Sequence, residues 1–127
     1  MGARLVTAPT ILVIDDHSGF RATARRMLER DGWTVVGEAA DGRSALAAVA
    51  ELAPDVVLLD IGLPDVDGFE VAERLAGGPD APSIVLVSSR DRAAYGERIN
   101  ASRAAGFLSK DEIDGHALRS LVAGSDR

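Results

Sequence analysis

Three short, almost uninterrupted apolar runs constrain the fold of this chain more than any other feature. They cover residues 10–15 (TILVID), 55–60 (DVVLLD) and 83–88 (SIVLVS). A half-exposed strand alternates apolar and polar residues, whereas a continuous run of Val, Ile and Leu is typical of a strand covered on both faces. The runs therefore predict a parallel sheet between two layers of helices. Residues 33–38 and the weaker candidate 106–109 complete a set of five expected strands.

Between these runs lie segments whose apolar residues recur with the period of an α-helix. Residues 19–30 and 43–52 carry apolar side chains three or four positions apart, which places them on one helix face. Two more helices are expected at 68–76 and 113–122, and a weaker one at 92–101, where the expected face is mainly alanine and charged residues. Strand and helix therefore alternate five times along the chain.

Polar and helix-breaking residues mark the limits of the first two helices. Ser18 is the expected N-cap of the first, and Asp41 or Ser44 opens the second, because their side-chain oxygens can accept hydrogen bonds from free backbone N–H groups. Gly32 and Pro54 follow the two helices and are expected to end them. Local chemistry thus agrees with the periodicity.

Alternating strands and helices indicate a doubly wound α/β fold, because each parallel strand returns through a right-handed helical crossover. We expect a (βα)5 flavodoxin-like three-layer sandwich whose parallel sheet has the strand order 2-1-3-4-5. In such sheets, ligands bind beyond the carboxyl ends of the strands, where the strand order reverses. We expect residues 1–9 to be an N-terminal extension, residues 10–123 a single domain and residues 124–127 a short tail.

The composition fits one globular domain and excludes several classes of protein. The chain has 127 residues, 46% of them apolar and 27% charged. It contains no cysteine, which excludes disulfide scaffolds and agrees with the cytoplasm as its expected location. No segment has the length and apolarity of a signal peptide or a membrane span. A net charge of −6 and a pI near 4.8 disfavour nucleic acid, so we expect no direct contact with nucleic acid or membrane.

Polar residues follow the expected strands at their carboxyl ends. Asp15 and Asp16 follow the first strand, Asp60 ends the third, Ser88 ends the fourth and Lys110 follows the fifth. If the first and third strands are neighbours, three carboxylates lie close together, and their mutual repulsion requires a cation. Carboxylate oxygens suit Mg²⁺, which completes its coordination shell with water and phosphate oxygens. The sequence therefore predicts a magnesium site.

A carboxylate, a magnesium ion and a lysine together indicate phosphoryl transfer. The metal offsets the charge of the phosphoryl oxygens, and a carboxylate can act as the nucleophile that forms an aspartyl phosphate. Asp60 is the candidate nucleophile. Lys110 can pair with the phosphoryl group, and Ser88 can donate a hydrogen bond to it.

Four motifs carry a resemblance to a known family. In order they are ILVIDDH, VVLLDIGLPDVDGFE, IVLVSS and GFLSK, and together they resemble the receiver domain of bacterial two-component response regulators over residues 10 to about 122. The resemblance implies that Asp60 is phosphorylated. It also implies that Asp15, Asp16, Asp60 and the backbone carbonyl of Gly62 bind Mg²⁺.

The remaining implied roles concern the switch and the partners. Ser88 and Lys110 would bind the phosphoryl group, and Phe107 would be the aromatic switch residue. Phosphorylation would draw Ser88 inward, let Phe107 repack and shift the face formed by the fourth and fifth helices. The resemblance implies a sensor histidine kinase or phosphotransfer protein as donor, a downstream protein target, and a dimer that forms on phosphorylation. It implies no enzyme activity beyond the chain's own phosphorylation and dephosphorylation.

Some residues depart from the commonest family pattern or have simpler interpretations. Lys110 precedes Asp111 where many members have proline, Ser88 replaces threonine, and Phe107 replaces tyrosine. Phe107 could be simple core packing. His17 beside the acidic pair is interpreted as a loop residue rather than a metal ligand, because no second histidine accompanies it.

Other functions compete with this interpretation. A dehalogenase-type phosphatase requires a second aspartate where Gly62 stands, and a flavin-binding protein requires a phosphate-binding loop where Asp15 and Asp16 would repel phosphate. A phosphorylation-independent binding module stays open. So does the form of the output: we expect a single-domain regulator, whereas the phrase VVGEAADGRSAL resembles receivers that carry a helix-turn-helix transcription domain.

Overall fold

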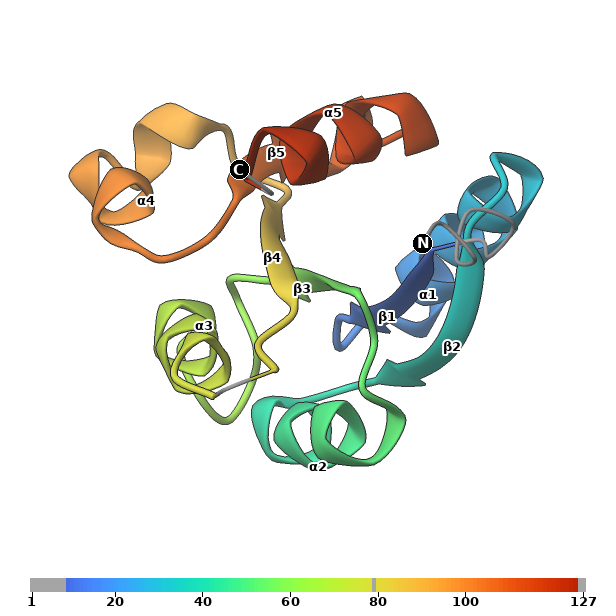
Figure 1. Ribbon diagram of the computed structural model, residues 1–127. Coiled ribbons are helices and arrows are strands. Elements are labelled where there is room, and N and C mark those ends of the chain that lie inside the picture. The colour runs from blue at the N-terminus through green and yellow to red at the C-terminus, as the bar shows by residue number, and fades with distance from the viewer. Residues whose placement is uncertain (1–8, 79, 126–127) are drawn as a thin grey trace.

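The computed structural model describes residues 9–78 and 80–125, with side chains as far as residue 123. Its centre is a five-stranded parallel sheet of strand order β2-β1-β3-β4-β5, which confirms the predicted order (Figure 1). The strands are β1 (Thr10–Ile14), β2 (Thr34–Ala39), β3 (Val56–Asp60), β4 (Ser83–Ser88) and β5 (Gly106–Ser109). Every strand begins within one residue of its expected position.

Five helices cover the two faces of this sheet. They are α1 (Ser18–Arg30), α2 (Gly42–Leu52), α3 (Gly68–Ala76), α4 (Glu97–Ala101) and α5 (Gly115–Ser125). Helices α1 and α5 lie on one face, and α2, α3 and α4 lie on the other (Figure 1). The three-layer, doubly wound architecture is therefore confirmed.

The continuous apolar runs serve both layers at once. Ile11 and Val13 of β1 face the core beneath α1 and α5, while Leu12 and Ile14 face the core beneath α2, α3 and α4. All four side chains are fully buried. A strand whose successive side chains point to opposite faces needs apolar residues at every position when both faces are covered, which explains the pattern of the sequence.

One predicted helix cap and one predicted helix need correction. Helix α1 begins at Ser18, so its N-cap is His17 rather than Ser18, whereas Asp41 caps α2 through a hydrogen bond from Ser44 N–H, as expected. The expected helix at 92–101 is broken into a single 3₁₀ turn, Arg92–Ala94, and the short α4, because Gly96 adopts a φ of +56°.

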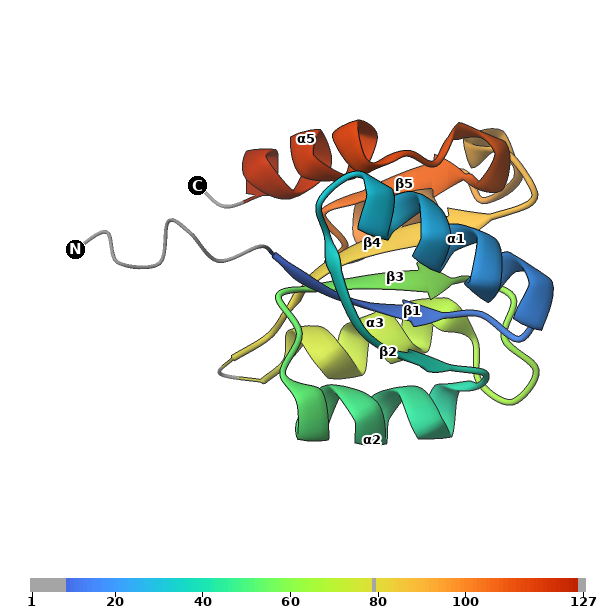
Figure 2. The same ribbon diagram turned by 90° about the vertical axis from the view of Figure 1, so that its right-hand side faces the viewer.

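The amino ends of the five parallel strands lie at one edge of the sheet. All strands point the same way, so their carboxyl ends meet at the opposite edge, on the right in Figure 2. Helix α5 continues to Ser125, which is beyond the domain limit expected at residue 123. Residues 1–8 of the expected N-terminal extension lie outside the described residues. In the described part of the chain, no helix is long and apolar enough to cross a bilayer.

Candidate functional site

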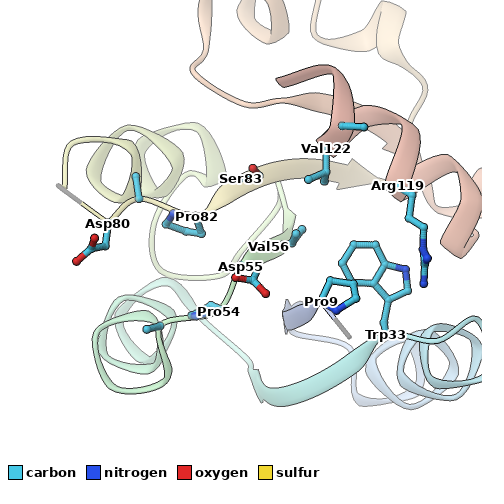
Figure 3. Close-up of a pocket in the computed structure, with 13 residues that line it drawn as sticks. Pro9, Trp33, Pro54, Asp55, Val56, Asp80, Pro82, Ser83, Arg119 and Val122 are labelled. Carbon is cyan, nitrogen blue, oxygen red and sulfur yellow. The ribbon is translucent and has the colours of Figure 1, made fainter. Parts of the chain in front are cut away.

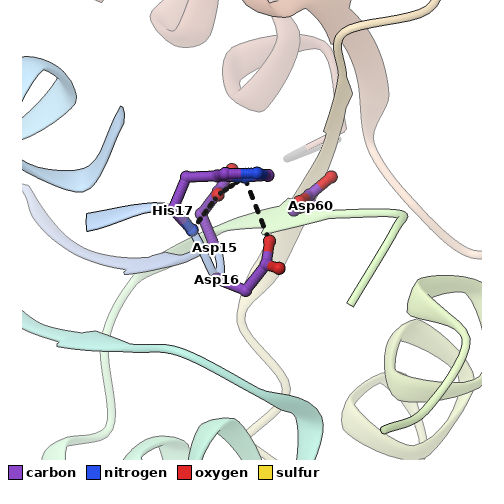
Figure 4. A group of neighbouring side chains, drawn as sticks. All are labelled: Asp15, Asp16, His17 and Asp60. Atoms are coloured by element: carbon purple, nitrogen blue, oxygen red, sulfur yellow. Dashed lines mark hydrogen bonds and ion pairs between the residues drawn. The ribbon is translucent and has the colours of Figure 1, made fainter. Parts of the chain in front are cut away.

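Three carboxylates meet where the strand order of the sheet reverses. Asp15 follows β1 and Asp60 ends β3, and these two strands are neighbours in the sheet. One carboxylate oxygen each of Asp15, Asp16 and Asp60 and a ring nitrogen of His17 lie within 4.8 Å of one another (Figure 4). Asp15 is fully buried and Asp60 is only 5% exposed. The structure thus forms the acidic cluster that the sequence predicts.

Lys110 closes this cluster from the end of β5. Its Nζ lies 2.6 Å from Asp15 Oδ2 and 3.7 Å from Asp60 Oδ2, and it sits 4.5 Å from the centre of the Phe20 ring. Asp15 Oδ2 accepts no hydrogen bond from the described residues, so the ammonium group is its compensating partner. One cation therefore serves two buried carboxylates.

The turn after β5 holds Lys110 in place without a proline. Lys110 starts a 3₁₀ turn, Lys110–Glu112, whose N-cap is Ser109. Ser109 Oγ donates to Asp111 Oδ1 at 2.7 Å, and Glu112 accepts from the Ser109 N–H. Asp111, where many family members have proline, therefore contributes a local hydrogen bond that fixes the loop.

Asp60 carries an electrostatic cost in this arrangement. Burial raises the pKa of its carboxyl group, and the neighbouring charges of Asp15 and Asp16 act in the same direction. The N–H of Gly62, which donates to Asp60 Oδ1 at 3.1 Å, and the charge of Lys110 oppose this rise without cancelling it. The charged form of Asp60 is therefore disfavoured until further positive charge arrives.

The loop after β3 is fixed by a close backbone contact. A Cβ atom on Gly68 would lie 2.7 Å from the Asp60 carbonyl oxygen and 2.6 Å from Ile61 Cα, so only glycine fits. The Gly68 N–H donates to the Ile61 carbonyl at 2.9 Å. This contact folds the start of α3 back onto the strand end and holds the Asp60–Gly62 turn open to solvent at Gly62.

His17 lies in the cluster, closer than the sequence suggested. Its Nδ1 is 3.2 Å from Asp15 Oδ1 and 3.1 Å from Asp16 Oδ1, while 71% of its side chain is exposed (Figure 4). The backbone N–H of His17 also donates to Asp15 Oδ1 at 2.8 Å. The interpretation as an ordinary loop residue missed these contacts, because the sequence shows adjacency but not side-chain direction.

Ser88 and Phe107 lie beside the cluster and contact a residue that the sequence analysis did not single out. Ser88 is 4% exposed, and its Oγ lies 2.5 Å from the hydroxyl oxygen of Tyr95 and accepts from the Arg90 N–H at 3.0 Å. Phe107 is buried, and its ring centre lies 6.0 Å from that of Tyr95. The described hydrogen-bond partners of the Ser88 hydroxyl group are thus Tyr95 and Arg90, not Asp60.

The donor set fits a hard divalent cation. Three carboxylates converge, and Lys110 is the one lysine or arginine of the described residues that pairs with two of them. Oxygen donors of this kind favour Mg²⁺, Ca²⁺ or Mn²⁺ over softer metals. The cluster is therefore a candidate metal site, and the fold and site together define an α/β domain with a cation-binding acidic site at the switch point of its sheet.

Comparison with known proteins identifies the family. The chain belongs to the response regulator receiver domain family, whose model matches residues 11–123. It is similar to the DNA-binding transcriptional activator EvgA of Escherichia coli, with 34% identity over 112 residues, which cover 88% of this chain and 55% of EvgA. It is also 44% identical over 86 residues to a protein-glutamate methylesterase/protein-glutamine glutaminase of Myxococcus xanthus, covering 67% of this chain and 25% of that protein.

Solved structures agree with this assignment. The signal receiver domain of NarL from Mycobacterium tuberculosis superposes with a TM-score of 0.82 at 32% identity, covering 94% of this chain and 97% of that one. A two-component response regulator of the LuxR family from Aurantimonas gives a TM-score of 0.82 at 29% identity, covering 93% and 87%. The chain spans about half the length of the transcriptional regulators among its curated relatives, 49% and 55% in two examples.

Proposed function

We propose that Asp60 accepts a phosphoryl group while Asp15, Asp16, Asp60 and the backbone carbonyl of Gly62 hold Mg²⁺. The observation that carries the proposal is the pairing of Lys110 with both Asp15 and Asp60, at 2.6 and 3.7 Å. An incoming phosphoryl group needs compensating positive charge; Lys110 supplies one such charge, and a metal held by the carboxylates would supply more. Membership of the receiver family supports the same assignment.

The chemistry assigns one task to each side chain. A carboxylate oxygen of Asp60 attacks the phosphorus atom of a phosphohistidine on the donor; the O–P bond forms as the N–P bond breaks, and the departing imidazole takes a proton from solvent. Lys110 pairs with the phosphoryl oxygens, and Ser88 donates its hydroxyl hydrogen to one of them. The bound metal supplies charge neutralisation.

A sensor histidine kinase or phosphotransfer protein is the proposed donor, and a protein that recognises the face of the fourth and fifth helices is the proposed target. The chain would catalyse only its own phosphorylation and the hydrolysis of its own aspartyl phosphate. We place it in the cytoplasm, and we propose residues 10–123 as the receiver domain.

Labelling with acetyl phosphate tests the phosphoacceptor. Intact-mass measurement should detect one added phosphoryl group in the presence of Mg²⁺ and none in EDTA. Asp60→Asn should abolish the product. Asp55→Asn is the matched control, because Asp55 directly precedes the same strand at its other end and should leave labelling unchanged. Labelling of Asp60→Asn, or none of the wild type, would reject the proposal, and the second result would favour a phosphorylation-independent binding module.

The relatives support a second candidate for the output. EvgA is a DNA-binding transcriptional activator about twice as long as the matched region. A transcription regulator that carries this receiver therefore competes with a regulator that acts alone through protein contacts. The acidic charge of the chain predicts that this part of the protein does not itself bind DNA. The mass of the intact protein from native cells separates the two.

A further inference from the structure

We propose that Tyr95 is the positioning residue that couples Ser88 to residues 92–101, and that its hydroxyl group competes with the phosphoryl group on Asp60 for the hydroxyl of Ser88. This inference rests on the proposed function of Asp60 and extends it to the regulation of the same site. It assigns to Tyr95 the task that the sequence analysis gave to Phe107.

The first observation is the hydrogen bond itself. The two hydroxyl oxygens of Ser88 and Tyr95 lie 2.5 Å apart, and Ser88 Oγ also accepts from the Arg90 N–H. Either hydroxyl group can be the donor, and each has one hydrogen to donate. In the arrangement that we propose, Ser88 donates to Tyr95, so its hydrogen is not available to a phosphoryl oxygen. Because Ser88 is only 4% exposed, water cannot readily replace Tyr95 as its partner.

The second observation is the aromatic packing that aims the Tyr95 hydroxyl at Ser88. The Tyr95 ring lies between two other rings, edge-on to Phe69 at 5.9 Å and tilted to Phe107 at 6.0 Å between ring centres. Phe69 lies in the first turn of α3, and Phe107 lies in β5. Two separate elements therefore fix the position of the Tyr95 ring, and the only described hydrogen bond of the Tyr95 side chain is the one to Ser88.

The third observation is how few side chains hold residues 92–101 to the rest of the molecule. Within this segment only Ile99 is buried and only Tyr95 is half-buried; every other residue is exposed. By comparison, α1 buries two side chains and α3 buries four. Exposed arginines make further contacts: Arg98 pairs with Asp67 at 2.8 Å and lies over the Phe69 ring, and Arg92 lies over the Phe107 ring. A segment with so little buried apolar surface has low local stability, so the loss of one of its two apolar contacts changes its conformation or mobility.

A competition follows from these three observations. Phosphorylation places oxygens beside the end of β4, and Ser88 turns its hydrogen toward them. Tyr95 then loses its buried partner, and its ring and residues 92–101 are released from the sheet. By thermodynamic reciprocity, anything that weakens the Ser88–Tyr95 hydrogen bond in the free chain strengthens phosphoryl binding.

Phe107 cannot perform this task, because it has no hydroxyl group to bind Ser88. It contributes one wall of the Tyr95 site and the face over which Arg92 lies, 5.9 Å from the ring centre. The tyrosine hydroxyl that many receivers carry on the fifth strand is thus supplied here from the segment that precedes α4.

The binding of beryllofluoride in the presence of Mg²⁺ tests the competition by calorimetry. Tyr95→Phe should bind it roughly two- to tenfold more tightly than the wild type, the ratio expected for one net hydrogen bond lost from the free state. In a Ser88→Ala background the same Tyr95→Phe change should have no effect on affinity, which a double-mutant cycle measures. Unchanged or weaker binding in Tyr95→Phe with Ser88 present would overturn the proposal.

Hydrogen exchange of the free chain provides a readout that does not depend on phosphorylation. Residues 92–101 should exchange faster in Tyr95→Phe than in the wild type, whereas α1 should exchange equally in both. Beryllofluoride should raise exchange at 92–101 in the wild type and change it little in the variant. If the wild type fails to bind beryllofluoride, the proposed function fails; equal exchange of the two free proteins would overturn the role of Tyr95 by itself.

Discussion

The two ends of the sheet are built from the same strands but differ in what they hold. At the carboxyl end, three carboxylates and Lys110 converge, two of the carboxylates buried. At the amino end, Thr10 and Asp55 join β1 and β3 by reciprocal hydrogen bonds: Thr10 Oγ1 donates to Asp55 Oδ2 at 3.0 Å and accepts from the Asp55 N–H at 2.8 Å. One end concentrates charge without balancing it, and the other satisfies its polar groups locally.

A hollow lies at the end of the sheet opposite the acidic cluster. A pocket of about 710 Å³ opens at the amino end, lined in part by Pro9, Trp33, Asp55 and Arg119 (Figure 3). Two of its charged side chains are engaged elsewhere: Asp55 binds Thr10, and Arg119 donates to the Asp31 carbonyl at 2.7 Å. Pocket size therefore does not locate the site in this fold. Convergent groups that are electrostatically incompatible without a ligand locate it instead.

The largest expected effect comes from removing the cation at the carboxyl end. Lys110→Ala leaves Asp15 and Asp60 without their shared partner, so phosphorylation by acetyl phosphate should slow by about 10²–10³-fold, as for loss of one preorganised charged donor. The free energy of unfolding without metal should fall by about 2 kcal/mol, less than for a fully buried pair because the lysine side chain is 18% exposed. Labelling kinetics and urea unfolding, followed by the fluorescence of Trp33, measure both.

A cation at the amino end provides the control for Lys110. Arg119 lies over the Trp33 ring, 5.4 Å from its centre, and is exposed. Arg119→Ala should leave the labelling rate within twofold of the wild type, roughly the range of surface substitutions. If the two alanine variants slowed labelling equally, the distinction between the ends of the sheet would be lost.

The next effect concerns how ionisation of Asp60 lowers the free energy of unfolding. Because burial raises the pKa of Asp60, the folded chain binds a proton there more tightly than the unfolded chain, so the stability of the wild type falls as pH rises from about 4 through the raised pKa. Asp60→Asn removes this loss. Without metal, the variant should therefore be more stable by about 1 kcal/mol at neutral pH and should lose the advantage near pH 4.

Magnesium should narrow the difference in stability between these two proteins. It stabilises the wild type through binding to the folded state and has less affinity for the variant, so the gap in melting temperature should narrow as Mg²⁺ is added. Thermal melts at several pH values and Mg²⁺ concentrations show whether it does. A variant less stable than the wild type in EDTA would mean that Lys110 and the Gly62 N–H already compensate Asp60 fully.

The fold was predictable because its determinants are local and repeated. Five strands could be placed within a residue, since continuous apolarity has few explanations other than a strand covered on both sides. The segment 92–101 was predicted wrongly as one helix. Its break depends on the positive φ of Gly96 and on burial of only Tyr95 and Ile99, and neither leaves a periodic pattern. Short elements held by tertiary contacts escape sequence analysis for this reason.

The site was predictable where strand topology alone brings residues together. Asp15, Asp60 and Lys110 follow strands, so the sheet order was enough to place them near one another. The contact of Ser88 with Tyr95 was missed, because it joins a strand end to a side chain seven residues later through an irregular turn. Tyr95 is the only tyrosine in the chain, and its place in an otherwise alanine-rich and charged segment was the one available signal.

The smallest expected effect tests the amino end. Thr10→Val keeps the shape of the side chain but removes both hydrogen bonds of Thr10 Oγ1 with Asp55. The free energy of unfolding should fall by about 1 kcal/mol, because these groups are near solvent and water replaces part of what is lost. Asp60 should be labelled at the wild-type rate, because β1 remains paired along its length with β2 and β3. The change in labelling rate can be expressed as a change in activation free energy. If this change exceeded the loss in the free energy of unfolding, the register of β1 at Thr10 would affect the position of Asp15, which follows the same strand.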